Sequence, residues 1–101
     1  MEKKNGVVEK YFDNGNLKSR ANYKNDNRDG MREEWYDNGQ LESRATYKDD
    51  KLNGLIEVWY TDGQQWIRET YKDGNRDGLY NEWDENGNLV ESTMYKDGVK
   101  Q

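Results

Sequence analysis

The chain has 101 residues, a net charge of −5 and only 31% hydrophobic residues. This length is enough for one small domain and too short for a second hydrophobic core. It contains no His and no Cys, which removes the commonest general base, the commonest transition-metal ligand, disulfides and thiol chemistry. The negative charge opposes binding to phosphate backbones or anionic head groups, because two like-charged surfaces would have to approach. We therefore expect no nucleic-acid partner, no membrane partner and no cofactor.

Aromatic residues are the main source of apolar surface. The chain has eight Tyr, four Trp and one Phe, and each can bury a large area if they line up on one surface. No apolar run approaches the roughly eighteen residues of a membrane helix, and the first residues lead into no signal-peptide apolar region. We expect a soluble protein whose compartment the sequence leaves open, with the cytoplasm favoured.

Self-similarity organises the chain. Glycines at 6, 30, 54 and 78 open four units that align without gaps at a spacing of 24 residues. The units span residues 6–29, 30–53, 54–77 and 78–101, and residues 1–5 match the end of a preceding linker. The whole chain, 1–101, is thus predicted to be one repeat domain. With columns counted from the opening glycine, the tenth is always Gly, the eighteenth and nineteenth are Tyr-Lys, and the sixth is an aromatic stripe of Tyr11, Trp35, Trp59 and Trp83.

Each unit predicts a β-hairpin. About six residues rich in aromatics lead to a turn of the type Asp37-Asn38-Gly39, and about seven further residues end in Tyr. The segment between hairpins, as in residues 72–78, is a second polar turn. The predicted fold is all-β, a single-layer antiparallel β-meander solenoid of four 24-residue hairpin repeats with about eight strands.

The hairpin turn has two interpretations, which assign the faces of the sheet differently. A two-residue Asn-Gly turn places the fourth column opposite the fifteenth, so that Glu9 pairs with Arg20 and later units repeat the pair. A three-residue Asp-Asn-Gly turn with a bulge places all even columns on one face, where Trp, Leu, Ala and Tyr form a continuous apolar stripe. We favour the second, because one hydrophobic face contributes more than three exposed ion pairs at under about 1 kcal/mol each.

The recurring string resembles a known repeat. Residues 30–41, followed by Tyr47-Lys48-Asp49, resemble the MORN-repeat variant of bacterial proteins, some of which are catalogued as antitoxin-type components. The resemblance covers residues 6–101. It implies an elongated, curled single-layer sheet that acts as a non-catalytic scaffold for protein–protein interaction, with an antitoxin-like role. Departures from the pattern are Gln65, in place of the Leu that follows the turn, and Asp84, in place of the second aromatic.

Enzyme chemistry is not expected. Without His or Cys, a nucleophile would have to be Ser, Thr or Lys, and Ser19 and Ser43 have no adjacent base. The chain also contains no phosphate-binding glycine loop and no kinase motif. We therefore predict that the protein is not an enzyme.

One string has the spacing of a calcium loop. Asp73, Asn75 and Asp77 alternate before a glycine, and Asp84 stands at the twelfth position. The other linkers break this pattern, and a hairpin linker needs Asp, Asn and Gly for its turn geometry in any case. The expectation is that no metal binds.

A candidate partner-binding surface lies in the third and fourth units. Positions that are charged in the second unit become apolar there, which predicts a contiguous apolar patch that a soluble monomer seldom leaves open. The alternative is that the sheet curls and covers this region with its own linkers. The outer strands of the predicted sheet are also unprotected. Together with the patch, they lead us to expect a protein partner or a homodimer. The patch consists of Ile56, Val58, Tyr60 and Tyr80, joined by Trp66, Val90 and Met94 if the turn has three residues.

The aromatic stripe supports a second hypothesis. Trp35, Trp59 and Trp83 can be simply the apolar face of a thin protein with few aliphatic residues. If a curved sheet leaves them in a groove, they can stack on sugars or anchor a peptide. The alternative function is therefore a carbohydrate- or peptide-binding module.

Overall fold

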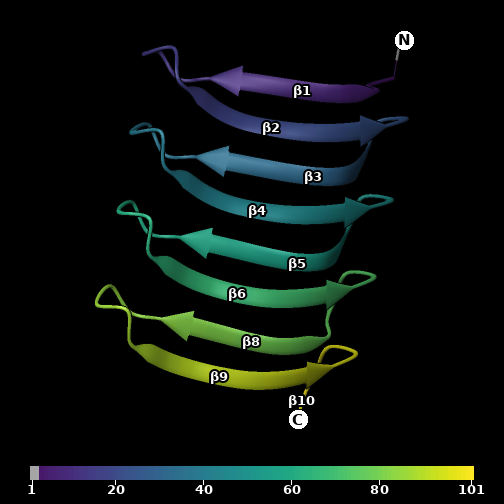
Figure 1. The fold of residues 1–101 in the computed structure, drawn as a ribbon. Helices are drawn as coiled ribbons and strands as arrows, with labels where there is room; N and C mark the ends of the chain where they lie inside the picture. The colour runs from purple at the N-terminus through teal and green to yellow at the C-terminus, as the bar shows by residue number, and fades with distance from the viewer. Residues whose placement is uncertain (1–2) are drawn as a thin grey trace.

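The computed structural model describes residues 3–101 and contains ten strands in one open antiparallel sheet, in which strands that follow one another in the chain lie side by side (Figure 1). Within these residues no helix occurs, so none is long and apolar enough to cross a membrane. The predicted all-β meander of hairpins is confirmed. The strands are β1 (Gly6–Tyr11), β2 (Leu17–Lys24), β3 (Asn27–Trp35), β4 (Leu41–Lys48), β5 (Lys51–Trp59), β6 (Gln65–Lys72), β7 (Asn75–Arg76), β8 (Gly78–Trp83), β9 (Leu89–Lys96) and β10 (Val99–Lys100).

The two strands beyond the eight expected are short. Segment β7 pairs with β6 and continues into β8 after a break at Asp77, so β7 and β8 together correspond to β3 or β5. Segment β10 adds two residues beside β9. The expectation that residues 1–5 continue a linker falls partly on residues 1–2, which lie outside the described part of the chain.

The sheet is a single curved layer without an enclosed core (Figure 1). Its extents are 45 × 34 × 12 Å, and its radius of gyration of 15.2 Å exceeds the roughly 13 Å of a compact domain of this length. Among residues 3–101, Ala21 is the one buried hydrophobic residue. A sheet normally buries one face against another layer of secondary structure, and among residues 3–101 no second layer is present. The side chains of this protein therefore pack mainly against their neighbours along each face.

The hairpin turns contain three residues. The backbone N–H of Phe12 donates to Asn16 O at 2.8 Å, and that of Gly15 donates to Phe12 O at 2.9 Å. The same two bonds recur in the other three units. Beside the turn, Tyr11 lies opposite Leu17, as the three-residue interpretation requires.

A bulge then restores the other register. Lys10 lies opposite Ser19, so Lys18 is an extra residue without a cross-strand partner. Beyond the bulge Glu9 lies opposite Arg20, which is the pairing that the two-residue turn predicted. The same shift occurs between the fifth and sixth columns of every unit.

The predicted single apolar stripe on the even columns is therefore wrong. Because side chains alternate along a strand, a one-residue shift moves every later residue to the other face. The second, fourth, sixth, twelfth, fifteenth and seventeenth columns share one face, here called the ladder face. The third, fifth, fourteenth, sixteenth and eighteenth columns share the other, here called the tyrosine face. Trp and Leu thus lie on the ladder face, and Ala and Tyr on the tyrosine face.

The linkers are two-residue hairpin turns that also join successive units. Asn25 and Asp26 have φ values of 51° and 70°, as the favoured mirror-image turn requires, and the strands on both sides continue up to them. The N–H of Asp26 donates to Lys4 O at 3.0 Å, and that of Gly74 donates to Leu52 O at 2.8 Å. Each linker turn is thereby hydrogen-bonded to the unit before it.

Candidate functional site

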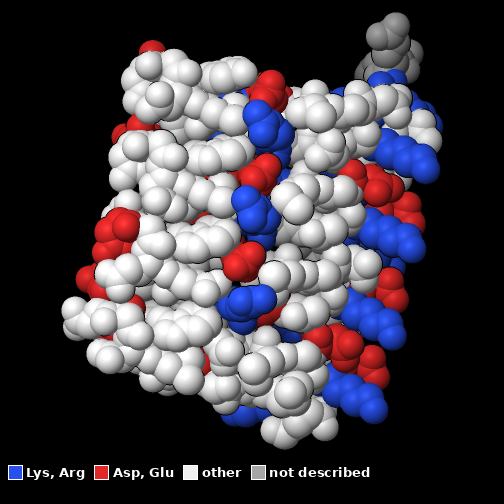
Figure 2. All heavy atoms as spheres, viewed as in Figure 1, with Lys and Arg blue, Asp and Glu red and all other residues white. Residues whose placement is uncertain are grey.

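A row of alternating charges crosses the ladder face. The fourth and fifteenth columns stand opposite each other both within a hairpin and between hairpins, so Arg20 has Glu9 on one side and Glu33 on the other. Figure 2 shows the resulting central stripe of alternating red and blue side chains. In strand order the row consists of Glu9, Arg20, Glu33, Arg44, Glu57 and Arg68, and ends in the uncharged Asn81 and Ser92.

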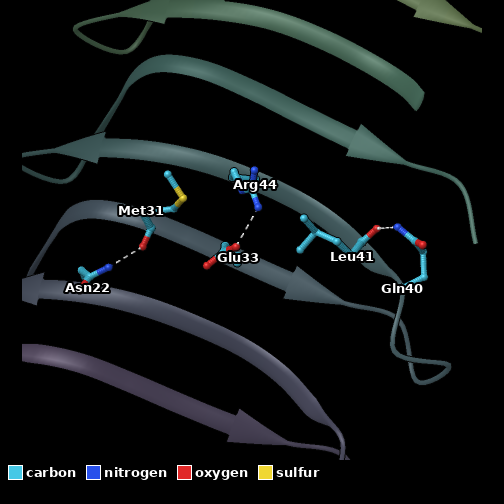
Figure 3. A network of polar contacts seen from close by, with 6 residues as sticks. All are labelled: Asn22, Met31, Glu33, Gln40, Leu41 and Arg44. Carbon is cyan, nitrogen blue, oxygen red and sulfur yellow. Dashed lines mark hydrogen bonds and ion pairs between the residues drawn. The ribbon is translucent and has the colours of Figure 1, made fainter. Parts of the chain in front are cut away.

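Two ion pairs in this row are formed within hairpins. Arg20 Nη2 lies 2.9 Å from Glu9 Oε2, and Arg44 Nη2 lies 3.3 Å from Glu33 Oε2 (Figure 3). These side chains are 18–43% exposed, so each pair is worth at most about 1 kcal/mol. Within residues 3–101, Arg68 is exposed and makes no ion pair.

The arginines also cover tryptophans of the next unit. The guanidinium carbon of Arg20 lies 5.8 Å from the Trp35 ring centroid, and that of Arg44 lies 5.9 Å from Trp59. Such cation–π contacts contribute about 0.5–1 kcal/mol when exposed. In the described part of the chain no cation lies over the ring of Trp83, which therefore lacks the arginine cover of Trp35 and Trp59.

An exposed apolar row runs beside the charges. The second column supplies an aliphatic side chain in every unit, and each is at least 36% exposed. Of the nine exposed large apolar side chains among residues 3–101, seven belong to the ladder face, which makes it the more apolar of the two faces at its surface. These seven are Val7, Met31, Leu55, Leu79 and Met94 on one side of the charges and Tyr11 and Leu89 on the other.

The tyrosine face carries a second ladder. Residues of the twenty-third column stand between tyrosines of successive units. In the third unit this residue is Arg76, whose guanidinium carbon lies 5.2 Å from the ring centroid of Tyr95. Arg76 Nε also donates to Tyr71 Oη at 3.3 Å, and this hydrogen bond raises the pKa of the guanidinium. The carboxylate of Glu69, 11% exposed, lies 3.3 Å from the same Nε. This face is therefore held together by a basic side chain interleaved with aromatic rings.

Most of the predicted partner-binding residues lie together on the tyrosine face, half-buried. Val58 lies opposite Ile67, a residue that the sequence analysis missed because the bulge moves its column to this face. The rings of Tyr60 and Trp66 stack at 4.7 Å with an interplanar angle of 11°. Ile56 and Tyr80 occupy the third column of the same face.

One member of the predicted patch lies on the other face: Met94 is opposite Leu79 and therefore belongs to the ladder face. Val90 occupies the bulge position of the fourth unit, as Trp66 does in the third, but is 55% exposed. The three-residue turn does not bring Met94 to the patch, because the bulge reverses the faces before its column is reached.

A cavity opens beside Trp83. It has a volume of about 310 Å³ and is lined by Gln64, Gln65, Trp83 and Gly87. Gln65 stands where other units have Leu, and its side-chain amide donates to Glu57 Oε2 at 3.1 Å. The third unit nevertheless keeps the register of the others.

The calcium-loop spacing does not form a loop. Asp73 and Asp77 lie at the linker end of β8, whereas Asp84 follows its other end, about 20 Å away at strand rise. Asp84 Oδ1 accepts the N–H of Asn86 at 2.9 Å and of Asn88 at 3.0 Å, and these bonds lower the pKa of its carboxyl. Among residues 3–101 no group of three or more acidic side chains could hold a metal ion.

Four tyrosines are partly shielded from solvent. Burial raises the pKa of Tyr36, Tyr60, Tyr71 and Tyr80, and the hydrogen bond from Tyr80 to Glu82 Oε1 at 2.7 Å raises that of Tyr80 further. Tyr60 Oη donates to Trp83 O at 2.8 Å, which joins the third unit to the fourth.

These tyrosines predict alkaline unfolding. In the unfolded chain they lose their protons near pH 10, but in the folded chain only at higher pH, so the free energy of unfolding falls as the pH rises above about 10. Urea denaturation between neutral pH and strongly alkaline pH, with tyrosinate absorbance recorded, measures this effect. A Tyr60→Phe variant, which copies Phe12 of the first unit, should show a shallower fall. A constant stability across this range would contradict the prediction.

Comparison with known families identifies the repeat. The family model described as MORN repeat variant matches residues 4–25, 28–49 and 76–97, which together exceed half of the chain. The unmatched stretch contains the third hairpin turn and Gln65. A comparison with curated proteins finds no match.

Proposed function

The chain belongs to the MORN repeat variant family, whose repeats are interaction modules, and on that premise we propose that it is a non-catalytic scaffold that binds a protein partner through its ladder face. The observation that carries the proposal is the exposed apolar row beside the charges. The aliphatic side chains of this row alternate with Asn22, Thr46 and Thr70, and the row ends with Leu79 beside Met94. Exposed apolar side chains mixed with polar groups are the usual composition of a protein interface.

The tyrosine face is the less suitable surface. Its apolar residues Ile56, Val58 and Trp66 are half-buried against their neighbours, whereas Val7 and Leu79 on the ladder face are 57% and 44% exposed. A partner removes more apolar area from water where more is exposed, and that area supplies most of the binding free energy. The ladder face therefore offers the stronger driving force.

Paired variants test which face binds. Leu55→Glu with Leu79→Glu places charges in the exposed row, and Val58→Arg with Trp66→Glu does the same on the tyrosine face. We expect the first pair to abolish capture of the partner from native lysate while far-UV dichroism stays unchanged. The second pair should leave capture intact. If only the second pair abolishes capture, the predicted patch on the tyrosine face is the interface and the ladder-face proposal is wrong.

The antitoxin-like role that the sequence resemblance implies is a narrower form of this proposal. It would make the captured partner a toxic protein whose active surface the scaffold covers. Co-expression should then restore the growth of cells that produce the identified partner, and the Leu55→Glu, Leu79→Glu variant should fail to do so. Equal growth with the wild-type protein and with the variant would contradict the antitoxin-like role.

A second candidate function rests on the cavity at Trp83. An uncovered tryptophan ring with two glutamine side chains beside it offers a stacking surface and hydrogen-bonding amides, which suit a sugar ring. Soluble oligosaccharides from a glycan array should then quench tryptophan fluorescence of the protein. Trp83→Ala should remove the quenching and Trp35→Ala should leave it, because Arg20 covers Trp35.

A further inference from the structure

We propose that the ladder face binds a second copy of this chain, packed face to face with its strand order reversed. The proposal rests on the proposed function in one respect, that the ladder face is an interaction surface. It names the occupant as an identical chain, and the argument is the sequence of charges along the row.

Two kinds of two-fold axis can relate face-to-face sheets. An axis perpendicular to the strands keeps the strand order, so each Glu would lie over the same Glu of the second copy. An axis parallel to the strands reverses the order. Because Glu and Arg alternate along the row, reversal about a point between neighbouring strands places every Glu over an Arg or over an uncharged end of the row. Charge complementarity therefore selects the second axis.

Full overlap of the two sheets defines the register. With the axis between β4 and β5, Glu33 faces Arg68 of the second copy and Arg44 faces its Glu57. Arg68, which makes no ion pair among the described residues of its own chain, thereby acquires one. The charged Glu9 and Arg20 face the uncharged Ser92 and Asn81, so no like charges meet.

The same register covers four of the exposed apolar side chains of the ladder face. Val7, 57% exposed, faces Met94 of the second copy, 48% exposed. Tyr11, 59% exposed, faces Leu89, 55% exposed. The partners lie near opposite edges of one chain's sheet, on β1 and on β9, and reach each other only across the interface.

The dimensions of the sheet suit this packing. A face of 45 × 34 Å exceeds the about 800 Å² per partner that a specific interface buries. The sheet is a single layer, so its ladder face is open across all of its strands, and aligned sheets pack about 10 Å apart with strands within about 30° of each other. The surface area of 6800 Å² is also larger than the roughly 6000 Å² of a compact monomer of this mass.

A charge-swap experiment tests the register. Sedimentation equilibrium should show a dimer of the full chain. Arg68→Glu and Glu33→Arg should each weaken it on the order of ten- to a hundred-fold, because each places like charges face to face twice in the symmetric dimer. The double variant should recover most of the affinity. Since residues 33 and 68 lie three strands apart in one chain, roughly 14 Å, recovery can arise only between copies.

Matched controls keep the test specific. Arg32→Glu changes an arginine beside the row whose column lies on the tyrosine face, and it should leave the dimer unchanged. Circular dichroism confirms that each variant is folded. A monomer at all concentrations up to millimolar, or a double variant no better than the single ones, overturns the proposal. A monomer that still captures a different protein through Leu55 and Leu79 would overturn this inference while leaving the proposed function standing.

Cross-linking checks the same arrangement independently, because the chain contains no cysteine. A mixture of Val7→Cys and Met94→Cys proteins, treated with a short bis-maleimide, should give a cross-linked dimer. Val7→Cys protein alone should not, since its two cysteines would lie at opposite edges of the dimer. Cross-linking of Val7→Cys alone, or none in the mixture, contradicts the reversed strand order.

Discussion

Replacing Arg76 with Leu should lower the free energy of unfolding by about 2 kcal/mol, because it leaves a nearly buried carboxylate without its counter-charge. The loss is smaller than for a fully buried pair, since the Arg76 side chain is itself 43% exposed. Glu69 as a whole residue is only 9% exposed, and its Oε1 lies 3.3 Å from Arg76 Nε without the geometry of a hydrogen bond. The ion pair is therefore its main compensation for burial among the described residues. Urea denaturation of the variant beside the wild-type protein measures the loss.

A double variant separates charge from packing. The second unit has Ala45 where the third has Glu69, and Leu52 where the third has Arg76. Glu69→Ala with Arg76→Leu therefore copies a pair that the same architecture already accommodates. We expect its stability to lie within about 1 kcal/mol of the wild type, as replacements of an ion pair by apolar residues often do. If the double variant is as unstable as Arg76→Leu alone, the loss comes from the contacts of the guanidinium with Tyr71 and Tyr95.

Gly30→Ala should lower the free energy of unfolding by about 2 kcal/mol and the melting temperature by about 10 °C. Gly30 has a φ of 106°, which side chains rarely adopt, and a Cβ would stand 3.3 Å from Asn22 Cβ. Asn22 has little freedom to move, because its Nδ2 donates to Met31 O at 2.9 Å (Figure 3). The opening glycine therefore meets both a backbone requirement and a close side chain. Thermal melts followed by circular dichroism test the prediction.

Gly15→Ala is the matched control. Gly15 also has a positive φ, 91°, but a Cβ there would meet nothing within 4 Å. The Gly15→Ala variant should therefore lose only the free energy that the unfavourable backbone conformation costs, about 1 kcal/mol. Equal losses at the two positions would show that the approach to Asn22 contributes nothing, and that glycine opens each unit for its backbone alone.

The repeat made most of the fold predictable from the sequence. Gly30, Gly39 and Tyr47 recur at a spacing of 24 residues, and Asn-Gly steps between aromatic-rich segments indicate hairpins. Few aliphatic residues exclude a thick core, so a single layer follows. The aromatic stripe and the Glu9–Arg20 type of pair were also visible in the sequence, each under one of two turn interpretations.

The assignment of faces was decided only by the tertiary structure. A three-residue turn and the Glu9–Arg20 pair are incompatible unless one residue is left out of the pairing, and the sequence carries no signal that Lys18 is that residue. The bulge forms because it lets the aromatic columns pair beside the turn and the charges pair beyond it, and alternation then places Met94 and Ile56 on opposite faces.

The sequence by itself determined the hairpins, their number and their single layer, because those follow from turn chemistry and periodicity within about 24 residues. The tertiary structure decided how neighbouring hairpins meet. Contacts such as Arg20 beside Glu33 and Arg76 beside Tyr95 join residues of different units, and they depend on the register between strands that no local pattern encodes. The continuous charge row, and with it the candidate interface, exists only once that register is set.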